Sequence, residues 1–202
     1  VIDCIHTTAA SHSRVFIIEV MGHKVGWVTL HAGIAGGADI ILIPEIPYDI
    51  DKVVEAINKR NKAGKVFTIL AVAEGAISKE DAKLSKKELK KKQEEDKKKY
   101  PSVAYKLENE LQKKLDLDIR ITIPGHTQRG GSPCPYARVL STRLGSHAAK
   151  LILNDQYGYM VGIVNNKVKK VPLEECAGKL KMVAPDEQLV LDAKRIGISF
   201  GD

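Results

Sequence analysis

Short, continuous apolar runs alternate with amphipathic stretches along most of this chain. A run without polar alternation is typical of an internal parallel strand, because helices cover both of its faces. The stretches at 1–10, 25–35 and 53–64 have the periodicity and the boundaries of helices. We therefore predict an α/β fold whose strands are Val15 to Val20, Ile40 to Ile43, Val66 to Ala73 and a β-branched run from Arg120 to Pro124.

Local start and stop signals place the remaining elements. Asp51 is the expected cap of the helix that ends at Gly64. A helix from Cys134 to His147 is expected to be interrupted near its end by Gly145. Asn165 and Asn166 then predict a tight turn between two strands. These strands occupy residues 158–164 and 167–171, and short helices follow at 172–177 and 185–195.

The segment from about residue 78 to residue 115 differs from the rest in composition. It is rich in lysine and glutamate, and its spaced leucines predict two helices that are broken at Pro101. The first of these helices should face mostly solvent. We expect the segment to be an insertion that packs lightly beside the sheet.

The composition is that of a globular protein. The chain has 202 residues and a mass of 22.2 kDa, and 44% of its residues are hydrophobic, enough for a substantial core. Its three cysteines are far apart and lack C-x-x-C spacing, so neither a zinc site nor a disulfide framework is implied, and a cytoplasmic location fits best. No apolar run reaches membrane-spanning length, so no membrane partner is expected.

The positive charge is concentrated in one segment. The net charge is +7, and residues 79–99 contain ten lysines and six acidic residues, so this segment holds four of the seven net charges. It contains no arginine and no aromatic residue, whereas nucleic-acid recognition uses forked donors and stacking surfaces. The pattern favours a solvated helical face and not a nucleic-acid-binding arm.

Candidate chemistry is densest between Arg120 and Arg138. The predicted strand there is followed by a loop with His126 and Arg129, by two glycines, and by a helix start at Ser132 and Pro133. Ligands of open α/β sheets bind at the carboxyl ends of strands, and guanidinium groups fit the oxygens of phosphate. The residues therefore fit an anion site. They fit an ordinary loop with structural hydrogen bonds equally well.

Four sequence blocks in register favour the anion site. They are the turn and strand from Ser11 that end in M-G-H-K-V-G-W, then G-G-A-D-I-I-L-I-P-E from Gly36, A-V-A-E-G-A from Ala71 and G-H-T-Q-R-G-G-S-P from Gly125. Together they closely resemble the second half of the 6-phosphofructokinase family, apart from one long insertion. The resemblance implies a three-layer, open, mostly parallel sheet of Rossmann-like type. It also implies a fragment that lacks the N-terminal, donor-binding half, and the chain indeed begins without a methionine.

The resemblance implies two parts. Residues 1–153 would form the fructose 6-phosphate-binding domain with the charged insertion. Residues 154–202 would form a C-terminal segment with the hairpin and short helices, which is expected to pack toward the N-terminal half.

A sugar-phosphate site is implied by the same resemblance. Arg14 and Arg120 would reach the substrate of a neighbouring subunit, which requires a homo-oligomer, expected to be a tetramer. The residues that would bind substrate within their own subunit are Met21, Gly22, His23, Glu74, His126, Thr127, Gln128 and Arg129.

Each of these assignments has a structural alternative. Arg14 could serve only in a surface ion pair, which contributes little to stability. Glu74 could cap the helix that follows it. We favour the sugar role for Glu74, because a carboxylate at a strand end beside a cationic loop is stabilised in its charged form.

A nucleotide effector site is implied less firmly. In regulated bacterial members an acidic residue at the position of Asp39 and a basic residue at that of Lys65 belong to this site, and Gly37 lies beside them. An arginine of the same site is replaced by His6 here. Control by the familiar effectors is therefore not expected.

Two further positions depart from the family pattern. His23 stands where the family reads M-G-R, and a histidine is shorter, mostly neutral at pH 7 and a poorer donor than arginine. Lys24 could compensate for that change. Ala137 stands where the family usually has an acidic residue.

The resemblance implies the substrate-binding half of a glycolytic 6-phosphofructokinase, which transfers a phosphoryl group from ATP to the 1-hydroxyl of fructose 6-phosphate. The catalytic base, the Mg²⁺ ligands and the donor loop would lie in the missing half, so this segment should contain no catalytic base, bind no metal and be inactive alone. Two alternatives remain: a pyrophosphate-dependent enzyme, and a degenerate paralogue that binds a sugar phosphate without turnover.

Overall fold

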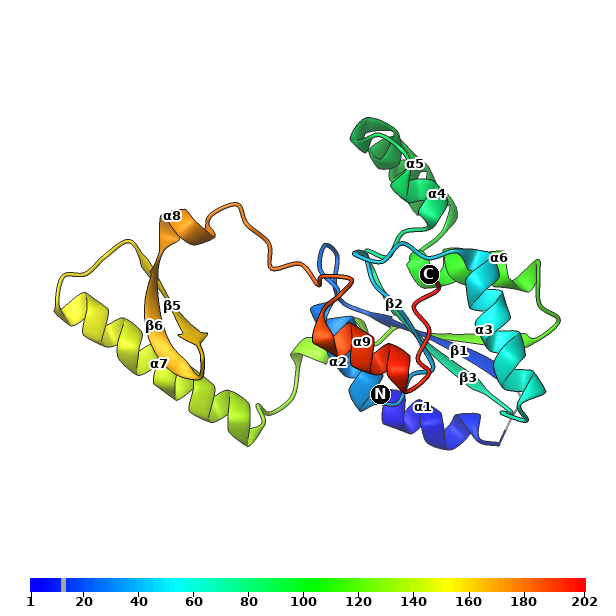
Figure 1. The fold of residues 1–202 in the computed structure, drawn as a ribbon, viewed down its shortest axis with the longest axis horizontal. Helices are drawn as coiled ribbons and strands as arrows, with labels where there is room; N and C mark the ends of the chain where they lie inside the picture. The colour runs from blue at the N-terminus through cyan, green and yellow to red at the C-terminus, as the bar shows by residue number, and fades with distance from the viewer. Residues whose placement is uncertain (12–13) are drawn as a thin grey trace. The chain divides into compact units, whose positions relative to one another are not determined.

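The chain forms two compact units in the structure, a computed structural model that describes residues 1–11 and 14–202. The first, here called the sheet unit, contains residues 1–128 and 182–202. The second, here called the hairpin unit, contains residues 129–181. Figure 1 shows the elements of each. His12 and Ser13, which belong to the predicted turn before the first strand, lie outside the described residues.

The sheet unit is built on four parallel strands in the order β2-β3-β1-β4. The central strand β1 pairs with both β3 and β4, so that Val15 lies opposite Thr68 on one side and Ile119 on the other. β2 and β3 fall within the predicted apolar runs and β1 extends its run only by Arg14, whereas β4 begins two residues before the predicted start at Arg120 and contains both Asp118 and Arg120. The bounds of the strands are β1 Arg14–Val20, β2 Ile40–Leu42, β3 Thr68–Ala73 and β4 Asp118–Thr122.

Helices cover both faces of this sheet (Figure 1). One face packs against α1 Ile2–Ala9, α2 Trp27–Ala35 and α9 Gln188–Arg195, with Leu30 and Val190 fully buried there. The other face packs against α3 Ile50–Lys62 and α6 Val103–Gln112. The fold is therefore the expected three-layer α/β arrangement.

The segment after the hairpin unit completes the sheet unit. Ser199 exchanges backbone hydrogen bonds with β2 and its preceding loop: the N–H of Ile41 donates to its carbonyl at 2.9 Å, and its own N–H donates to Asp39. The N–H of Asp49 donates to the carbonyl of Gly201 at 2.7 Å. Phe200 is fully buried between these bonds. Residues that are remote in sequence thus close the edge of the sheet beside β2.

The start of α3 differs from the prediction. Its N-cap is Asp49, whose carboxylate accepts the backbone N–H of Asp51 at 2.9 Å. Asp51 lies in the first turn, where its carboxylate pairs with Lys114 at 2.6 Å. The prediction that Asp51 is the cap was wrong, because an acidic residue in the first turn has nearly the same sequence signature as a capping residue.

The charged segment forms three helices, α4 Lys79–Ala82, α5 Lys86–Lys99 and α6. The break at Pro101 is confirmed, and α5 has no buried residue. The expectation of light packing was wrong for α6, because Ala104, Leu107 and Leu111 are fully buried against the sheet. α6 is therefore the crossover between β3 and β4, and only the α4 and α5 portion is added to that framework.

Ion pairs hold α5 in place. Asp81 of α4 is 5% exposed and pairs with Lys92 of α5 and with Lys106 of α6, the latter at 2.9 Å. Lys106 also reaches Asp96 of α5 at 2.8 Å. Burial would raise the pKa of Asp81, but the hydrogen bonds from both lysines outweigh it and hold that pKa below its usual value. We call these four residues the charge clamp.

The hairpin unit contains α7 Pro135–Leu153, β5 Tyr159–Val164, β6 Lys167–Pro172 and α8 Leu173–Cys176. The predicted hairpin is confirmed: β5 and β6 are antiparallel, and Asn165 and Asn166 both have positive φ angles, as a two-residue turn of this type requires. Gly145 does not interrupt α7, which runs through it to Leu153. Because α7 packs on this hairpin, the compact units divide at 128/129 and 181/182, and not at 153/154.

None of residues 129–181, all of which the structure describes, is buried. Large apolar side chains on α7 and the hairpin are exposed, among them Leu153 at 84% and Tyr136 at 74%. A unit without buried residues gains little hydrophobic stabilisation by itself. The hairpin unit therefore has no buried hydrophobic core of its own.

We expect hydrogen exchange to separate the two units in the isolated 202-residue chain. The amides of β5 and β6 should exchange much faster than those of β1 and β3, because the hairpin unit has no buried core to resist local opening. Exchange mass spectrometry at neutral pH measures this difference. Equal protection of the two pairs of strands would contradict the interpretation.

The charge clamp should make stability depend on pH in acid. The pKa of Asp81 is depressed in the folded chain, so its stabilisation is present above the unfolded value of 3.8 and is lost as the pH falls further. Asp81→Asn should therefore cost about 2 kcal/mol of unfolding free energy at pH 7, and less at pH 3. Urea unfolding at the two pH values tests this, with Glu95→Gln on the exposed face of α5 as the control.

Candidate functional site

The carboxyl ends of β1 and β3 lie side by side. Val20, the last residue of β1, is in register with Ala73, the last residue of β3, and the N–H of Glu74 donates to the carbonyl of Val20 at 3.0 Å. Glu74 and the loop of Met21 to Lys24 therefore start from the same edge of the sheet. In parallel sheets this edge is the usual position of a ligand site.

Gly75 allows the two loops to approach closely. A Cβ atom at this position would lie 1.8 Å from the carbonyl oxygen of His23, far inside van der Waals contact with backbone. Any side chain here would have to displace the loop after β1. Gly75 thus fixes where the backbone of His23 lies relative to Glu74.

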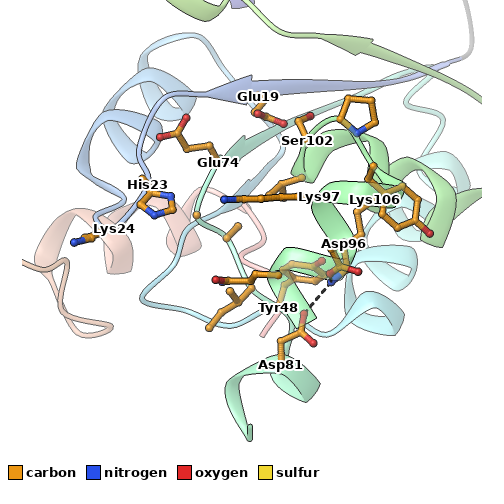
Figure 2. Close-up of a pocket in the computed structure, with 17 residues that line it drawn as sticks. Glu19, His23, Lys24, Tyr48, Glu74, Asp81, Asp96, Lys97, Ser102 and Lys106 are labelled. Atoms are coloured by element: carbon orange, nitrogen blue, oxygen red, sulfur yellow. Dashed lines mark hydrogen bonds and ion pairs between the residues drawn. The ribbon is translucent and has the colours of Figure 1, made fainter. Parts of the chain in front are cut away.

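A cavity of about 520 Å³ opens beside these strand ends (Figure 2). His23, Lys24 and Glu74 form one side of it. The opposite side is formed by α5 and the start of α6, and Tyr48 contributes to the floor. The residues on this side are Gln93, Asp96 and Lys97 of α5, Tyr100, Pro101 and Ser102 of the connection, and Val103 and Lys106 of α6.

The acidic groups of the cavity differ in whether they already have partners. Glu19 is buried in β1, and its carboxylate accepts the N–H of Ala104 at the start of α6 at 2.8 Å. Asp81 and Asp96 are neutralised within the charge clamp. The Glu74 carboxylate makes no ion pair or side-chain hydrogen bond with any residue that the structure describes. Glu74 is therefore the carboxylate that is available to a ligand.

The loop after β4 contacts the same edge of the sheet but does not line this cavity. It forms a 3-10 helix, η1, at Gly125–Arg129. The Oε1 atom of Gln128 accepts the N–H of Met21 at 3.1 Å, and the Thr127 hydroxyl donates to Pro124. His126 is exposed. The structure thus connects Met21 with Gln128, and separately brings His23 and Glu74 into one cavity.

Arg14 and Arg120 share one acidic partner. Asp118 accepts from Arg14 at 2.6 Å and from Arg120 at 3.0 Å. Arg14 is the first residue of β1, so it lies at the end of that strand opposite to His23. The ion-pair alternative for Arg14 is therefore realised in this chain, and a role of both arginines toward a neighbouring subunit stays a prediction. Arg129 is exposed and is the first residue of the hairpin unit.

The residues of the expected effector site make structural bonds. Asp39 accepts the N–H of Ile69 at 2.8 Å and pairs with Arg60 at 2.9 Å. Burial raises the pKa of Asp39 above its usual value. His6 hydrogen-bonds the carbonyl of Gly37 at 2.9 Å, and Lys65 lines a small separate cavity with Arg14. The carboxylate of Asp39 is thus already engaged, and an effector role of these residues stays a prediction.

Sequence reasoning did not single out three residues that shape the site. Glu45 accepts the N–H groups of Gly26 at 2.9 Å and Val183 at 3.0 Å, which ties the start of α2 to the last segment of the sheet unit. Glu19 positions α6. Lys97 lines the cavity from α5. Glu19 could have been found, because it is the one charged residue inside a continuous apolar run.

The cavity combines a free carboxylate with cationic groups. Lys24 and Lys97 form no ion pair with any described residue, and His23 lies between Glu74 and Lys24. A carboxylate accepts hydrogen bonds from hydroxyl groups, and ammonium groups bind anions. The arrangement therefore suits a ligand with both hydroxyl groups and negative charge. Among the described residues, no group of three or more His, Cys, Asp or Glu side chains could hold a metal ion.

Comparisons with known proteins agree on one family. A family model described as Phosphofructokinase matches residues 1–152. A relative from Spirochaeta thermophila, named ATP-dependent 6-phosphofructokinase, is 48% identical over 201 residues, which cover 100% of this chain and 54% of that protein. This chain spans about half the length of the curated relatives that it matches.

Solved structures agree in fold. The structure of phosphofructokinase from Saccharomyces cerevisiae superimposes with a TM-score of 0.71 at 35% identity, over 86% of this chain and 22% of that one. A pyrophosphate-dependent phosphofructokinase from Marinobacter aquaeolei gives a TM-score of 0.70 at 20% identity, over 97% of this chain and 50% of that one. At this identity the second likeness concerns the fold alone. In the described part of the chain, no helix has the length and apolar character needed to cross a bilayer.

Replacing Gly75 tests the close approach of the two loops. Gly75→Ala should lower the free energy of unfolding by about 1–3 kcal/mol, because the new methyl group overlaps the backbone of His23. Gly145→Ala is the matched control. A Cβ atom at Gly145, within α7, would have no heavy atom within 4 Å beyond its chain neighbours and the nearby backbone of the helix, so this substitution should leave the free energy of unfolding unchanged or raise it slightly. Urea unfolding of both variants is the measurement. A neutral Gly75→Ala would refute the tight contact.

Proposed function

Because this chain belongs to the phosphofructokinase family, we propose that it is the sugar-phosphate-binding half of a 6-phosphofructokinase. The full-length enzyme transfers a phosphoryl group to the 1-hydroxyl of fructose 6-phosphate, a glycolytic reaction of the cytoplasm. The observation that carries the proposal is that Glu74 and His23, from two different sequence blocks, open into one cavity at adjacent strand ends.

Phosphoryl transfer needs orientation and charge neutralisation more than covalent help from the protein. Glu74 accepts hydrogen bonds from sugar hydroxyl groups and so orients the fructose ring. Lys24 lies beside Glu74 and offsets part of the negative charge of the substrate, and the His23 imidazole offers a hydrogen bond next to it. Met21, Gly22 and the η1 residues His126, Thr127, Gln128 and Arg129 complete the substrate site in this proposal.

The phosphoryl donor in this proposal is ATP with Mg²⁺. The Spirochaeta thermophila relative is named ATP-dependent, which supports this choice at 48% identity. The donor loop, the Mg²⁺ ligands and the catalytic base belong to the remainder of the protein. Pyrophosphate is the alternative donor.

Arg14 and Arg120 act on the substrate of a neighbouring subunit in a homotetramer. The two guanidinium groups lie close to each other because both form ion pairs with the carboxylate of Asp118. Their side chains are 31% and 56% exposed, so they remain accessible to an anionic ligand. Assembly would bring this pair to the phosphate of the adjacent site.

The remainder of the protein covers the hairpin unit. That unit has no buried residue, although Tyr136, Val139 and Leu153 are large and apolar, and the relatives are nearly twice as long as this chain. In this proposal, additional chain of the same subunit packs on the exposed apolar side chains of the hairpin unit and buries them.

A degenerate, non-catalytic paralogue is the second candidate. Two departures from the family pattern favour it, His23 in the substrate cavity and Ala137 in α7. Such a protein would bind fructose 6-phosphate through Glu74 without transferring phosphate.

Turnover by full-length protein tests the proposed function. With fructose 6-phosphate and Mg²⁺, the protein should form fructose 1,6-bisphosphate with ATP and much less with pyrophosphate. Glu74→Gln should raise KM about tenfold or more, because an NH2 group, which donates and does not accept hydrogen bonds, replaces one carboxylate oxygen. Product formation with pyrophosphate but not with ATP would contradict ATP as the donor and favour pyrophosphate. Binding of fructose 6-phosphate without turnover, restored to turnover by His23→Arg, would favour the degenerate paralogue.

A further inference from the structure

The lysine-rich helix α5 presents one face to the substrate cavity. Gln93, Asp96, Lys97 and Tyr100 all line it. Gln93, Asp96 and Lys97 share one face of α5, because residues three and four positions apart lie on the same side of a helix, and Tyr100 directly follows the helix as its C-cap. The remaining lysines of α5 line no part of this cavity. Lys97 is therefore the lysine of α5 that lines the cavity.

Lys97 is the free cation of this face. Asp96 is bound to Lys106 within the charge clamp. Lys97 is exposed and makes no ion pair with any residue in the described part of the chain. Figure 2 shows its ammonium group extended across the cavity toward the side where His23 and Glu74 lie. A cation therefore enters the site from the wall opposite the strand ends.

The position of Lys97 is fixed by the fold around it. The charge clamp binds α5 to both α4 and α6, and α6 is itself bound to β1 through Glu19. The start of α5 is fixed by a capping box between Ser85 and Glu88. A lysine on a loosely attached helix would lose conformational entropy when it binds a ligand. Because these bonds already fix α5, that entropy cost is smaller for Lys97.

We propose that Lys97, on the charged helix α5, is a substrate-binding residue of the 6-phosphofructokinase site. The inference rests on the proposed function, since it names a further residue of the same site. Lys97 donates to the phosphate of the bound sugar phosphate or to the phosphoryl group in transfer. It thereby supplies positive charge on the cavity wall opposite His23. The family pattern has an arginine at the position of His23, so Lys97 would replace part of the charge that is missing there.

The test compares Lys97→Gln, Lys97→Arg and Lys98→Gln in the full-length enzyme. Lys98 is the matched control, because it is the adjacent exposed lysine of α5 and does not line the cavity. Steady-state kinetics with fructose 6-phosphate should give a kcat/KM about tenfold lower for Lys97→Gln, a change equivalent to about 1.4 kcal/mol. Lys97→Arg should retain most of the activity, and Lys98→Gln should match the unmodified enzyme.

Salt dependence distinguishes a charge contact from a structural effect. The difference between Lys97→Gln and the unmodified enzyme should shrink as ionic strength rises, because screening weakens the lost interaction. Equal kinetics of Lys97→Gln and Lys98→Gln in an active enzyme would overturn the role of Lys97 and leave the proposed function intact. A full-length protein without turnover of fructose 6-phosphate would overturn the proposed function and this inference together.

Discussion

The bond between Glu19 and the start of α6 is the constraint on which the rest of the site depends. A carboxylate inside the central strand of a buried sheet must be compensated, because an unpaired buried charge is strongly destabilising. The N–H of Ala104 compensates it at 2.8 Å, and the partial positive charge of a helix N-terminus acts in the same direction. α6 therefore lies in one register on β1. Through Lys106 that register extends to Asp96 of α5, and so to the wall of the cavity.

The framework of this fold could be predicted from sequence because its strands are nearly pure in composition. Val15 to Val20 and Val66 to Ala73 have no competing interpretation, and Asn165-Asn166 has the conformational freedom that a two-residue turn needs. α6 was mistaken for part of a loosely packed insertion. Its Leu107 and Leu111 have the same spacing as the leucines of a surface helix, and only the paired strands show that they are covered.

The candidate site was predictable in part for a similar reason. Residues that directly follow strands are placed by the sheet itself, so His23 and Glu74 meet as soon as β1 and β3 pair. Lys97 follows no strand. Its sequence neighbourhood contains many lysines of equal appearance, and the direction of each depends on how α5 is rotated against α6. That rotation is set by the charge clamp, whose members lie on three consecutive helices and carry no recognisable motif.

The last segment of the sheet unit has a consequence for how the protein is made. Residues 182–202 emerge from the ribosome only after the whole hairpin unit has been synthesised, yet Phe200 and the backbone of Ser199 and Gly201 close the edge beside β2. Until then β2 has an open edge, to which another nascent chain could add as a strand. A polypeptide interrupted during translation within the hairpin unit would therefore be prone to aggregation, although all four strands of its sheet are already present.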